Sequence, residues 1–351
     1  MIPSLFNTGL FSKPPTGGTV GGWKELGRTT LGSTADSIDV SSLADKRYLM
    51  CLNDFKPSGA TQNFQRFNND SGSNYAYRLS DNGGADATGV SQANNYWYGY
   101  GTSGIPEFTV AYIANLSANE KQSIQSTIQQ NTAGAGTAPQ RREGVNKWAN
   151  TTSVIDQITM INTGAGDFNT GSELVILGWD EADTHTDNFW EELASVTSVS
   201  SGANIDSGVF TAKKYLWVQA WFQGTGGTVA PWLRLGNTTV DSATNYAWRH
   251  SGDGGVDSTG TTASSCPMAA AADDDPIFVN MFIINNSSNE KLVYGHTINQ
   301  NTAGAANAPR RSEFAAKWDN TAAQCDIVGF FDNGGTGNFA TDCQIKVWGS
   351  D

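Results

Sequence analysis

The chain has 351 residues, a formal net charge of −13 and only 16% charged residues. Because no basic stripe runs through this acidic sequence, neither nucleic acid nor an anionic membrane surface is an expected partner. No apolar run reaches the length that a helix needs to cross a bilayer, while a hydrophobic content of 38% is enough for two cores of ordinary size.

The first 22 residues have no counterpart later in the chain. They contain three prolines and no helical period, which predicts an extended N-terminal arm. The apolar residues Phe6, Leu10 and Phe11 have nothing local to pack on, so the arm is either a frayed terminus or a segment that docks on a neighbouring subunit. It lacks a basic region followed by an apolar core, so we expect no signal peptide and synthesis in the cytoplasm.

From Trp23 onward, short apolar or alternating runs are separated by turn-forming residues. The predicted strands of the first half cover residues 36–40, 48–55, 108–116, 153–161 and 173–179. Short strands with frequent turn signals are typical of a β-sandwich or jelly roll. Residues 120–130 come nearest to a helical pattern, but the corresponding run over 291–298 reads as a strand, so we predict a strand in both places.

A repeat at an offset of 170 residues links the two halves of the sequence. Residues 129–142 read QQNTAGAGTAPQRR, residues 299–311 read NQNTAGAANAPRR, and Trp148 recurs as Trp318. A period this long indicates a duplicated domain and not a solenoid unit. We therefore predict an all-β chain, a tandem duplication of a jelly-roll-like β-sandwich preceded by the extended arm. The predicted ranges are the arm over 1–22, domain 1 over 23–180, a short acidic linker over 181–189 and domain 2 over 190–351.

The repeated phrase ends in two arginines in each copy, Arg141–Arg142 and Arg310–Arg311. Four arginines in matching pairs are conspicuous in so acidic a chain. One interpretation is that they point outward and form bidentate bonds with carboxylates of a partner. The other is that they pair with this chain's own acidic residues. The phrase itself is either a partner-binding loop or a loop that packs closely, since its glycines and alanines permit close backbone approach.

The sequence gives little support for catalysis. No histidine recurs between the copies, and no arrangement of a nucleophile with a histidine does. Asp167 and Glu173 have the chemistry of a paired-carboxylate, polysaccharide-degrading enzyme. The second copy has Asn338 and Gln344 near these places, which favours plain surface acids. We therefore expect no catalytic residue and no cofactor.

Neither a metal site nor a disulfide framework is expected. Aspartates in the Gly-rich loops, among them Asp70 and Asp241, lack the regular ligand spacing of a calcium loop. The cysteines do not recur between the copies, so we predict small buried thiols and leave open a bridge between Cys325 and Cys343. The four cysteines are Cys51, Cys266, Cys325 and Cys343.

The densest aromatic patch is NNYWYGY over residues 94–100, which holds Tyr96, Trp97, Tyr98 and Tyr100. Aromatic platforms bind sugars, and the same side chains are enriched at protein interfaces. The second copy has SSCPMAA over residues 264–270 instead. A duplicated lectin is expected to keep its sugar site in both copies. The patch is therefore interpreted as an interface, or as a glycan site in the first domain alone.

Three phrases carry a resemblance to a known family: RFNNDSGSNYAYR over residues 66–78, NTAGA with RRE within 131–143, and GAGDF with LGW within 164–179. They resemble jelly-roll modules of tailed-bacteriophage virion proteins, which occur in head decoration (cement) proteins and in tail or fibre proteins. The resemblance extends over residues 23–351. It is weaker in the second copy, which has RLGNTT over residues 234–239.

The resemblance implies a non-enzymatic structural protein on the virion surface. The function expected first is capsid decoration, in which the protein binds and stabilises the outside of a phage head. Its partners would then be the phage major capsid protein and further copies of itself, with a trimer as the expected oligomer. The alternative is a tail-associated or receptor-binding module that recognises carbohydrate. The family implies no catalytic residues.

Overall fold

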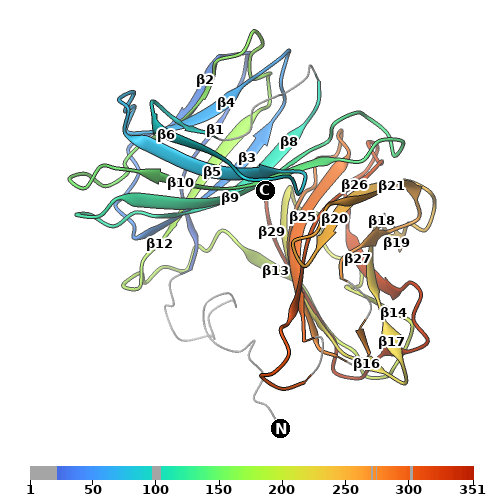
Figure 1. Ribbon diagram of the computed structural model, residues 1–351. Helices are drawn as coiled ribbons and strands as arrows, with labels where there is room; N and C mark the ends of the chain where they lie inside the picture. Colours follow the sequence, from blue (N-terminus) through green and yellow to red (C-terminus); the bar gives the residue numbers. More distant parts are fainter. Residues whose placement is uncertain (1–21, 97–103, 270–271, 274, 301–302) are drawn as a thin grey trace. The chain divides into compact units, whose positions relative to one another are not determined.

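The computed structural model describes residues 22–96, 104–269, 272–273, 275–300 and 303–351. In this part of the chain the regular structure consists of β-strands, labelled β1 to β29 (Figure 1). The all-β prediction is therefore confirmed. The arm predicted over residues 1–22 lies outside the described residues, apart from Gly22.

The first repeat contains strands β1 to β12. They are β1 (Lys24–Thr30), β2 (Ser37–Val40), β3 (Tyr48–Phe55), β4 (Asn63–Phe67), β5 (Tyr75–Asp81), β6 (Ala87–Gln92), β7 (Asn95–Tyr96), β8 (Glu107–Ala114), β9 (Lys121–Gln129), β10 (Gln140–Trp148), β11 (Ile158–Asn162) and β12 (Glu173–Trp179). The segment nearest to a helical pattern forms strand β9, as its counterpart in the second copy predicted.

The second repeat contains strands β13 to β29. They are β13 (Glu191–Thr197), β14 (Asn204–Asp206), β15 (Tyr215–Phe222), β16 (Gly224–Thr225), β17 (Thr228–Val229), β18 (Pro231–Asn237), β19 (Thr239–Val240), β20 (Tyr246–Gly252), β21 (Ser258–Ala263), β22 (Cys266–Pro267), β23 (Ala272–Asp273), β24 (Ile277–Ile284), β25 (Lys291–Asn299), β26 (Arg310–Trp318), β27 (Ile327–Asp332), β28 (Asn338–Phe339) and β29 (Gln344–Ser350).

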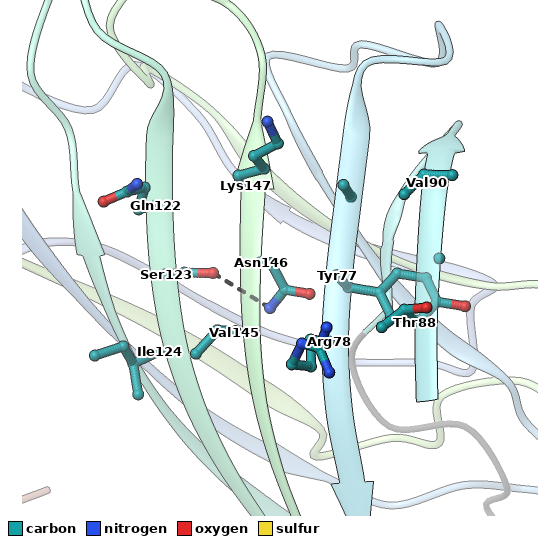
Figure 2. A pocket seen from close by; sticks show the side chains of 12 residues that line it. Tyr77, Arg78, Thr88, Val90, Gln122, Ser123, Ile124, Val145, Asn146 and Lys147 are labelled. Atoms are coloured by element: carbon teal, nitrogen blue, oxygen red, sulfur yellow. Dashed lines mark hydrogen bonds between the residues drawn. The ribbon is translucent and has the colours of Figure 1, made fainter. Parts of the chain in front are cut away.

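The two repeats have the same sheet topology. The larger sheet of the first repeat has the order β1-β12-β3-β8-β9-β10-β5-β6, and that of the second has the order β13-β29-β15-β24-β25-β26-β20-β21. The smaller sheets begin with β2-β11-β4 and β14-β27-β18. Figure 2 shows β9, β10, β5 and β6 side by side in this order. The chain is thus a tandem duplication of a jelly-roll-like β-sandwich.

The chain contacts divide the molecule into two compact units. The first unit consists of residues 1–80, 85–127 and 142–191, and the second of residues 81–84, 128–141 and 192–351. The second unit therefore contains the second repeat together with two short pieces of the first. The linker predicted over residues 181–189 belongs to the first unit.

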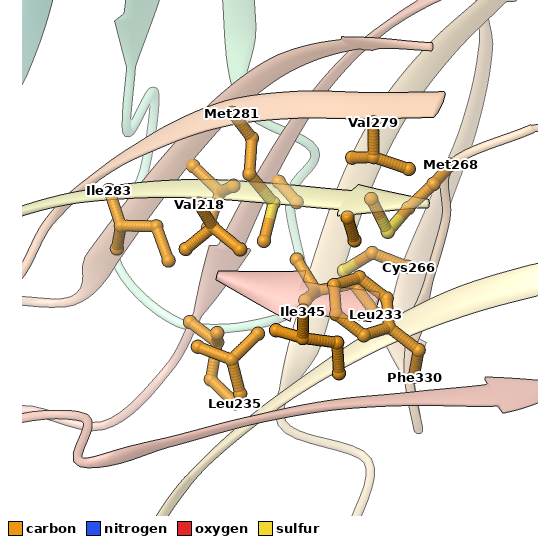
Figure 3. Close-up of a cluster of buried hydrophobic side chains, with 14 of the residues drawn as sticks. Val218, Leu233, Leu235, Cys266, Met268, Val279, Met281, Ile283, Phe330 and Ile345 are labelled. Atoms are coloured by element: carbon orange, nitrogen blue, oxygen red, sulfur yellow. The ribbon is translucent and has the colours of Figure 1, made fainter. Parts of the chain in front are cut away.

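Each unit has an apolar core between its larger and smaller sheets. In the first unit, the alternating strand β2 sends Ile38 and Val40 inward, where they pack with residues such as Leu49 and Ile176. The core of the second unit is larger and includes Val218, Leu233, Leu235, Cys266, Met268, Val279, Met281, Ile283, Phe330 and Ile345 (Figure 3). Period-two alternation of apolar residues explains this arrangement, because successive strand residues point to opposite sheet faces.

One polar arrangement recurs in both repeats and braces each sandwich. The Nε1 atom of the buried Trp148 donates to Asp70 at 2.7 Å, and Asp70 also accepts from Asn74 at 2.8 Å. The hydroxyl of Tyr75 donates to the carbonyl of Asp70 at 3.1 Å. The second repeat forms the same bonds with Trp318, Asp241, Asn245 and Tyr246. These aspartates therefore serve the fold, and the phrase NYAYR is part of this frame.

A lysine and an asparagine complete the duplicated frame. Lys121 donates from Nζ to the carbonyls of Asn119 and Asn150 and lies over the ring of Trp148. Lys291 makes the corresponding bonds and lies over Trp318. The side chains of Asn115 and Asn285 likewise bond to backbone at matching places in the two repeats, through the backbone N–H groups of Ile155 and Cys325 among others. Buried polar groups of this kind require such partners.

The four cysteines are free thiols, and all of them are buried. Burial raises the pKa of the Cys51 and Cys266 thiols, so both stay in the unreactive protonated form. The interpretation of small buried thiols is confirmed, and Cys325 and Cys343 do not form a bridge.

Candidate functional site

The larger sheet of the first unit has an open, hollowed face. Strands β5, β6, β9 and β10 form a pocket of about 490 Å³ there (Figure 2). Its lining residues are Ala76, Tyr77, Arg78, Thr88, Gly89, Val90, Gln122, Ser123, Ile124, Val145, Asn146 and Lys147. We call this surface the open face. It is a candidate for a binding site in the described part of the chain.

Strand alternation decides which side chains the open face presents. Along β9 and β10, Gln122, Ile124, Val145 and Lys147 are exposed, while the residues between them are buried. The buried Asn146 donates to Ser123 at 3.3 Å and to Gln125 at 3.1 Å. By the same alternation these buried polar groups point to the other side of the sheet, so the open face presents the exposed apolar side chains of Ile124 and Val145 beside those of Gln122 and Lys147.

An aromatic ring and a glycine shape the edge of the open face. A Cβ atom at Gly89 on β6 would lie 2.5 Å from the ring of Tyr77 on β5, so this ring occupies the space over the glycine. The second repeat has the same pair, since a Cβ atom at Gly260 would lie 2.3 Å from the ring of Trp248. Both glycines are needed for close approach of the ring to the neighbouring strand.

Two ion pairs frame the open face. Arg78 lies 3.1 Å from Asp86, and Lys147 lies 3.1 Å from Glu120. The side chains of Lys147 and Glu120 are 49% and 40% exposed, so solvent screens their attraction. Neither pair is locked by burial in the described structure.

The corresponding face of the second unit is covered. Residues 128–141, which connect and extend β9 and β10 and which we call the first loop segment, lie on it as part of the same unit. Lys317 donates to the carbonyl oxygens of Gln130, at 3.2 Å, and of Thr132. The backbone N–H of Gly134 donates to Glu290, and that of Ala135 donates to Asp319 at 3.2 Å.

The covering continues toward β20 and β21. The backbone N–H of Thr262 donates to the carbonyl of Ala135 at 2.7 Å, and Arg249 donates to the carbonyl of Pro139 at 2.9 Å. Under this cover Lys317 and Glu290 form an ion pair at 3.4 Å with side chains only 0% and 1% exposed. The same Lys–Glu pair is thus exposed in the first unit and buried in the second.

The first arginine pair is buried, which corrects the expectation that it points outward. Arg141 binds Asp257 through two hydrogen bonds of 3.0 and 2.7 Å. Arg142 is also buried. Burial raises the pKa of the buried Glu107, and the positive charge of Arg142 opposes this rise only in part. The alternative interpretation, pairing with an acidic residue of this chain, describes Arg141.

The two arginine pairs are also not equivalent. Strands β10 and β26 match at the offset of 170 residues, so Arg141 corresponds to Arg311 and Arg142 corresponds to Ser312. The backbone agrees, because Arg141 exchanges bonds with Asn82 and Arg311 exchanges the corresponding bonds with Asp253. Arg311 is 64% exposed, and Arg310 is half-buried.

The remaining predicted residues separate into described and undescribed ones. Phe6, Leu10, Phe11, Trp97, Tyr98 and Tyr100 lie outside the described residues, and Tyr96 is described only as a backbone position of β7. Glu173 lies 3.4 Å from Arg28 and accepts a hydrogen bond from Thr30. Asp167 is hydrogen-bonded to Asp36, which raises its pKa. The two acids therefore have separate partners.

Two features are absent from the described residues. These residues contain no group of three or more His, Cys, Asp or Glu side chains that could hold a metal ion. None of them forms a helix long and apolar enough to span a membrane.

The first unit contains a buried polar cluster that the sequence did not lead us to predict. Asn63 donates to Glu107 at 3.1 Å, and Asn95 donates to Gln65 at 3.4 Å, with all four side chains buried. In the second repeat, strand register places Pro231, Leu233 and Ile277 where the first has Asn63, Gln65 and Glu107. The signal was present, since Asn63, Gln65 and Phe67 alternate as inward residues of β4.

Burial raises the pKa of Glu107 to about 8, which makes a pH dependence testable. Between its ordinary value of 4.5 and about 8, the folded chain keeps a proton that the unfolded chain has released. The contribution of Glu107 to stability therefore falls as the pH rises through this window. The free energy of unfolding of Glu107→Gln, relative to that of wild type, should therefore rise by a few kcal/mol, as an order of magnitude, from the low-pH end of this window to the high-pH end.

Urea denaturation at both ends of the window measures this gain. The control is Glu120→Gln, which changes an exposed carboxylate. An equal stability difference at both ends for Glu107→Gln would show that the pKa of Glu107 is the same in the folded and the unfolded chain.

Comparisons with known proteins place the chain in no family. No family model matches it, and no curated protein does. Among solved structures, domains LG4-5 of the mouse laminin alpha1 chain align with 98% of this chain and 93% of that one, at 10% identity and a TM-score of 0.21. The LG1-3 region of the laminin alpha2 chain aligns with 90% of this chain and 64% of that one, at 8% identity and a TM-score of 0.21.

Proposed function

We propose that this chain is a non-catalytic structural protein that acts by binding other proteins, as a decoration protein on the outside of a tailed-phage head. The observation that carries the proposal is the kind of arrangement that the duplication has kept. Each recurring arrangement, such as Trp148 with Asp70 and Tyr75 or Lys121 with its two carbonyls, holds a sandwich together. What is repeated is a rigid body that presents surfaces.

Two further features support this role. A decoration protein strengthens a shell by mass action, since it binds the assembled state, and it needs folded surfaces more than a reactive pocket. The net charge of −13 favours solubility at high copy number. The open face supplies a protein-binding type of surface, with Val90, Ile124 and Val145 exposed beside charged side chains.

Quantitative mass spectrometry of purified phage particles, with heads and tails separated, tests the proposal. We expect a high copy number on heads in a fixed ratio to the shell protein. A chain lacking residues 1–22 should keep its circular dichroism spectrum and lose head binding. If the protein is absent from particles, it is not a head decoration protein. If the shortened chain still decorates heads fully, residues 1–22 are not the segment that binds them.

Carbohydrate recognition by a tail-associated module is the second candidate. The residues that line the pocket on the open face include Tyr77, Arg78 and Gln122, and small-molecule sites combine aromatic residues with a few polar groups. This candidate predicts few copies, confined to tails. It also predicts glycan binding by the purified chain that Gln122→Ala weakens, and a chain that binds no glycan would exclude it.

A further inference from the structure

We propose that two copies of this chain associate head to tail. In this contact, the loop between β25 and β26 of one copy covers the open face of the other copy's first unit. We call the described residues 298–300 and 303–311 the second loop segment. The proposal concerns self-association alone and does not depend on a phage particle being the location.

The second loop segment has the local geometry of the first. Gly134 and Gly304 both have positive φ, 86° and 97°, at matching places in the two repeats. The two arginines, Arg141 and Arg311, make the same backbone contact with the turn after the neighbouring strand. At these described positions the second loop segment therefore matches the segment that covers a sheet face in the second unit.

The second loop segment is exposed where the first is buried. Ile298 is 47% exposed, whereas its counterpart Ile128 is fully buried. Arg311 is 64% exposed, whereas Arg141 is 3% exposed. Arg311 pairs with Glu313 of its own strand at 2.5 Å, and its exposed guanidinium remains accessible to a further carboxylate.

The open face carries the residues that receive the first loop segment in the second unit. Five of the six receiving residues, of which Thr262 acts through its backbone N–H, have an identical or closely similar counterpart. The receiving residues Arg249, Asp257, Thr262, Glu290 and Lys317 correspond to Arg78, Asp86, Ser91, Glu120 and Lys147. Ser91 and Thr262 even share a positive φ, 52° and 49°. The exception is Asp319, which corresponds to Ala149, so one acceptor for a backbone N–H is missing.

The central contact is an aspartate between two arginines. Asp257 binds Arg141 and lies 3.6 Å from Arg249 of its own repeat. Asp86 has the corresponding partner, Arg78, and its side chain is 48% exposed. A carboxylate can accept a second guanidinium in bidentate geometry. Arg311 of another copy has the charge and the place in its loop to supply it.

The apolar part of the open face fits the same occupant. Val90, Ile124 and Val145 are 71%, 62% and 48% exposed. In the second unit, Tyr294 and Ala315 stand in the places of Ile124 and Val145, and both are buried. Covering the open face would remove this apolar area from water, which is favourable.

The two contacting surfaces differ, so the association is heterologous. Each copy carries one second loop segment and one open face. A single contact uses the second loop segment of one copy and the open face of the other, so each copy keeps one surface for a further contact. Head-to-tail contacts of this kind close into rings or grow into open chains. A variant with a damaged loop keeps a working face, and a variant with a damaged face keeps a working loop.

Sedimentation of the full chain tests the proposal through this asymmetry. Wild type should associate, and Arg311→Ala and Asp86→Ala should each weaken association by about thirtyfold or more, which is the loss typical of truncating one partner of a buried charge pair. Arg47→Ala, which removes an exposed arginine outside both surfaces, is the control and should leave association unchanged. Because both substituted side chains are exposed, the variants should keep the wild-type melting temperature.

Mixing distinguishes this contact from a symmetric one. Equal amounts of Arg311→Ala and Asp86→Ala chains should form a one-to-one dimer, since one supplies the intact face and the other the intact loop. Three results would overturn the proposal: a wild type that stays monomeric, an association that neither variant weakens, or a mixture with no more dimer than the separate variants.

Discussion

Replacing Lys317 by Met is expected to lower the free energy of unfolding by about 3–5 kcal/mol, because it leaves a buried carboxylate without its counter-charge. The ammonium of Lys317 faces Glu290 at 3.4 Å and also donates to two backbone carbonyls of the first loop segment. Burial raises the pKa of Glu290 and lowers that of Lys317. Both shifts measure the cost of holding these charges away from water.

The first repeat provides a matched control for this substitution. Lys147 forms the corresponding pair with Glu120, at 3.1 Å and in contact with solvent, and exposed pairs contribute about 0–1 kcal/mol. Lys147→Met should therefore cost about 1 kcal/mol or less. Chemical denaturation followed by tryptophan fluorescence measures both variants. Equal losses would mean that the first loop segment does not bury the second pair in solution.

A second variant separates the ion pair from the backbone contacts. Adding Glu290→Gln to Lys317→Met removes the stranded charge and should restore part of the lost stability. The carbonyls of Gln130 and Thr132 would still lack their donor, so recovery should stop short of wild type. Full recovery would show that these two hydrogen bonds contribute nothing.

The fold could be predicted because two independent signals agree in the sequence. Alternating strands such as residues 36–40 predict sheets by themselves. The duplication then corrects a local ambiguity, since residues 291–298 identify residues 121–129 as a strand. The brace of Trp148, Asp70 and Tyr75 is long-range, so its residues could be recognised as recurring but not as partners.

The outward interpretation fails for Arg141, which pairs with Asp257 of this chain, and the sequence already contained a reason to treat the two arginine pairs differently. Aligning the two Arg–Arg pairs by eye gives them equal roles, whereas the offset between Trp148 and Trp318 aligns Arg141 with Arg311 alone. The alignment of the two copies could not show that the two loops differ in burial. Their sequences are almost the same, and only tertiary contacts make Arg141 buried and Arg311 exposed.

The open face was missed because its parts are unremarkable in the sequence. Ile124 and Val145 belong to different strands, and each looks like an ordinary strand residue. Their exposure depends on what covers the sheet, which is a tertiary property. The usable signal was the pairing of Tyr77 with Gly89 and of Trp248 with Gly260 at the same spacing, which marks the same sheet edge in both repeats.

Truncation of Trp148 to alanine is expected to cost about 3–5 kcal/mol, the range for removing a large buried aromatic side chain. The indole is fully buried, packs against the rings of Phe67 and Tyr75, and lies under the ammonium of Lys121. Because it also donates to Asp70 at 2.7 Å, its loss removes packing and a charge-assisted hydrogen bond together.

Two further substitutions divide this loss between packing and hydrogen bonding. Trp148→Phe keeps most of the ring volume but not the N–H group, so it should cost about 1–3 kcal/mol, the range for a hydrogen bond to a charged group. Trp179→Ala removes the same side chain from a half-buried place, where it stacks on Tyr48 at 5.5 Å, and should cost about 1 kcal/mol. Urea denaturation measures all three variants. A loss for Trp148→Ala no larger than that for Trp179→Ala would mean that the recurring brace does not stabilise the sandwich, and the argument that the duplication kept structural residues would fail with it.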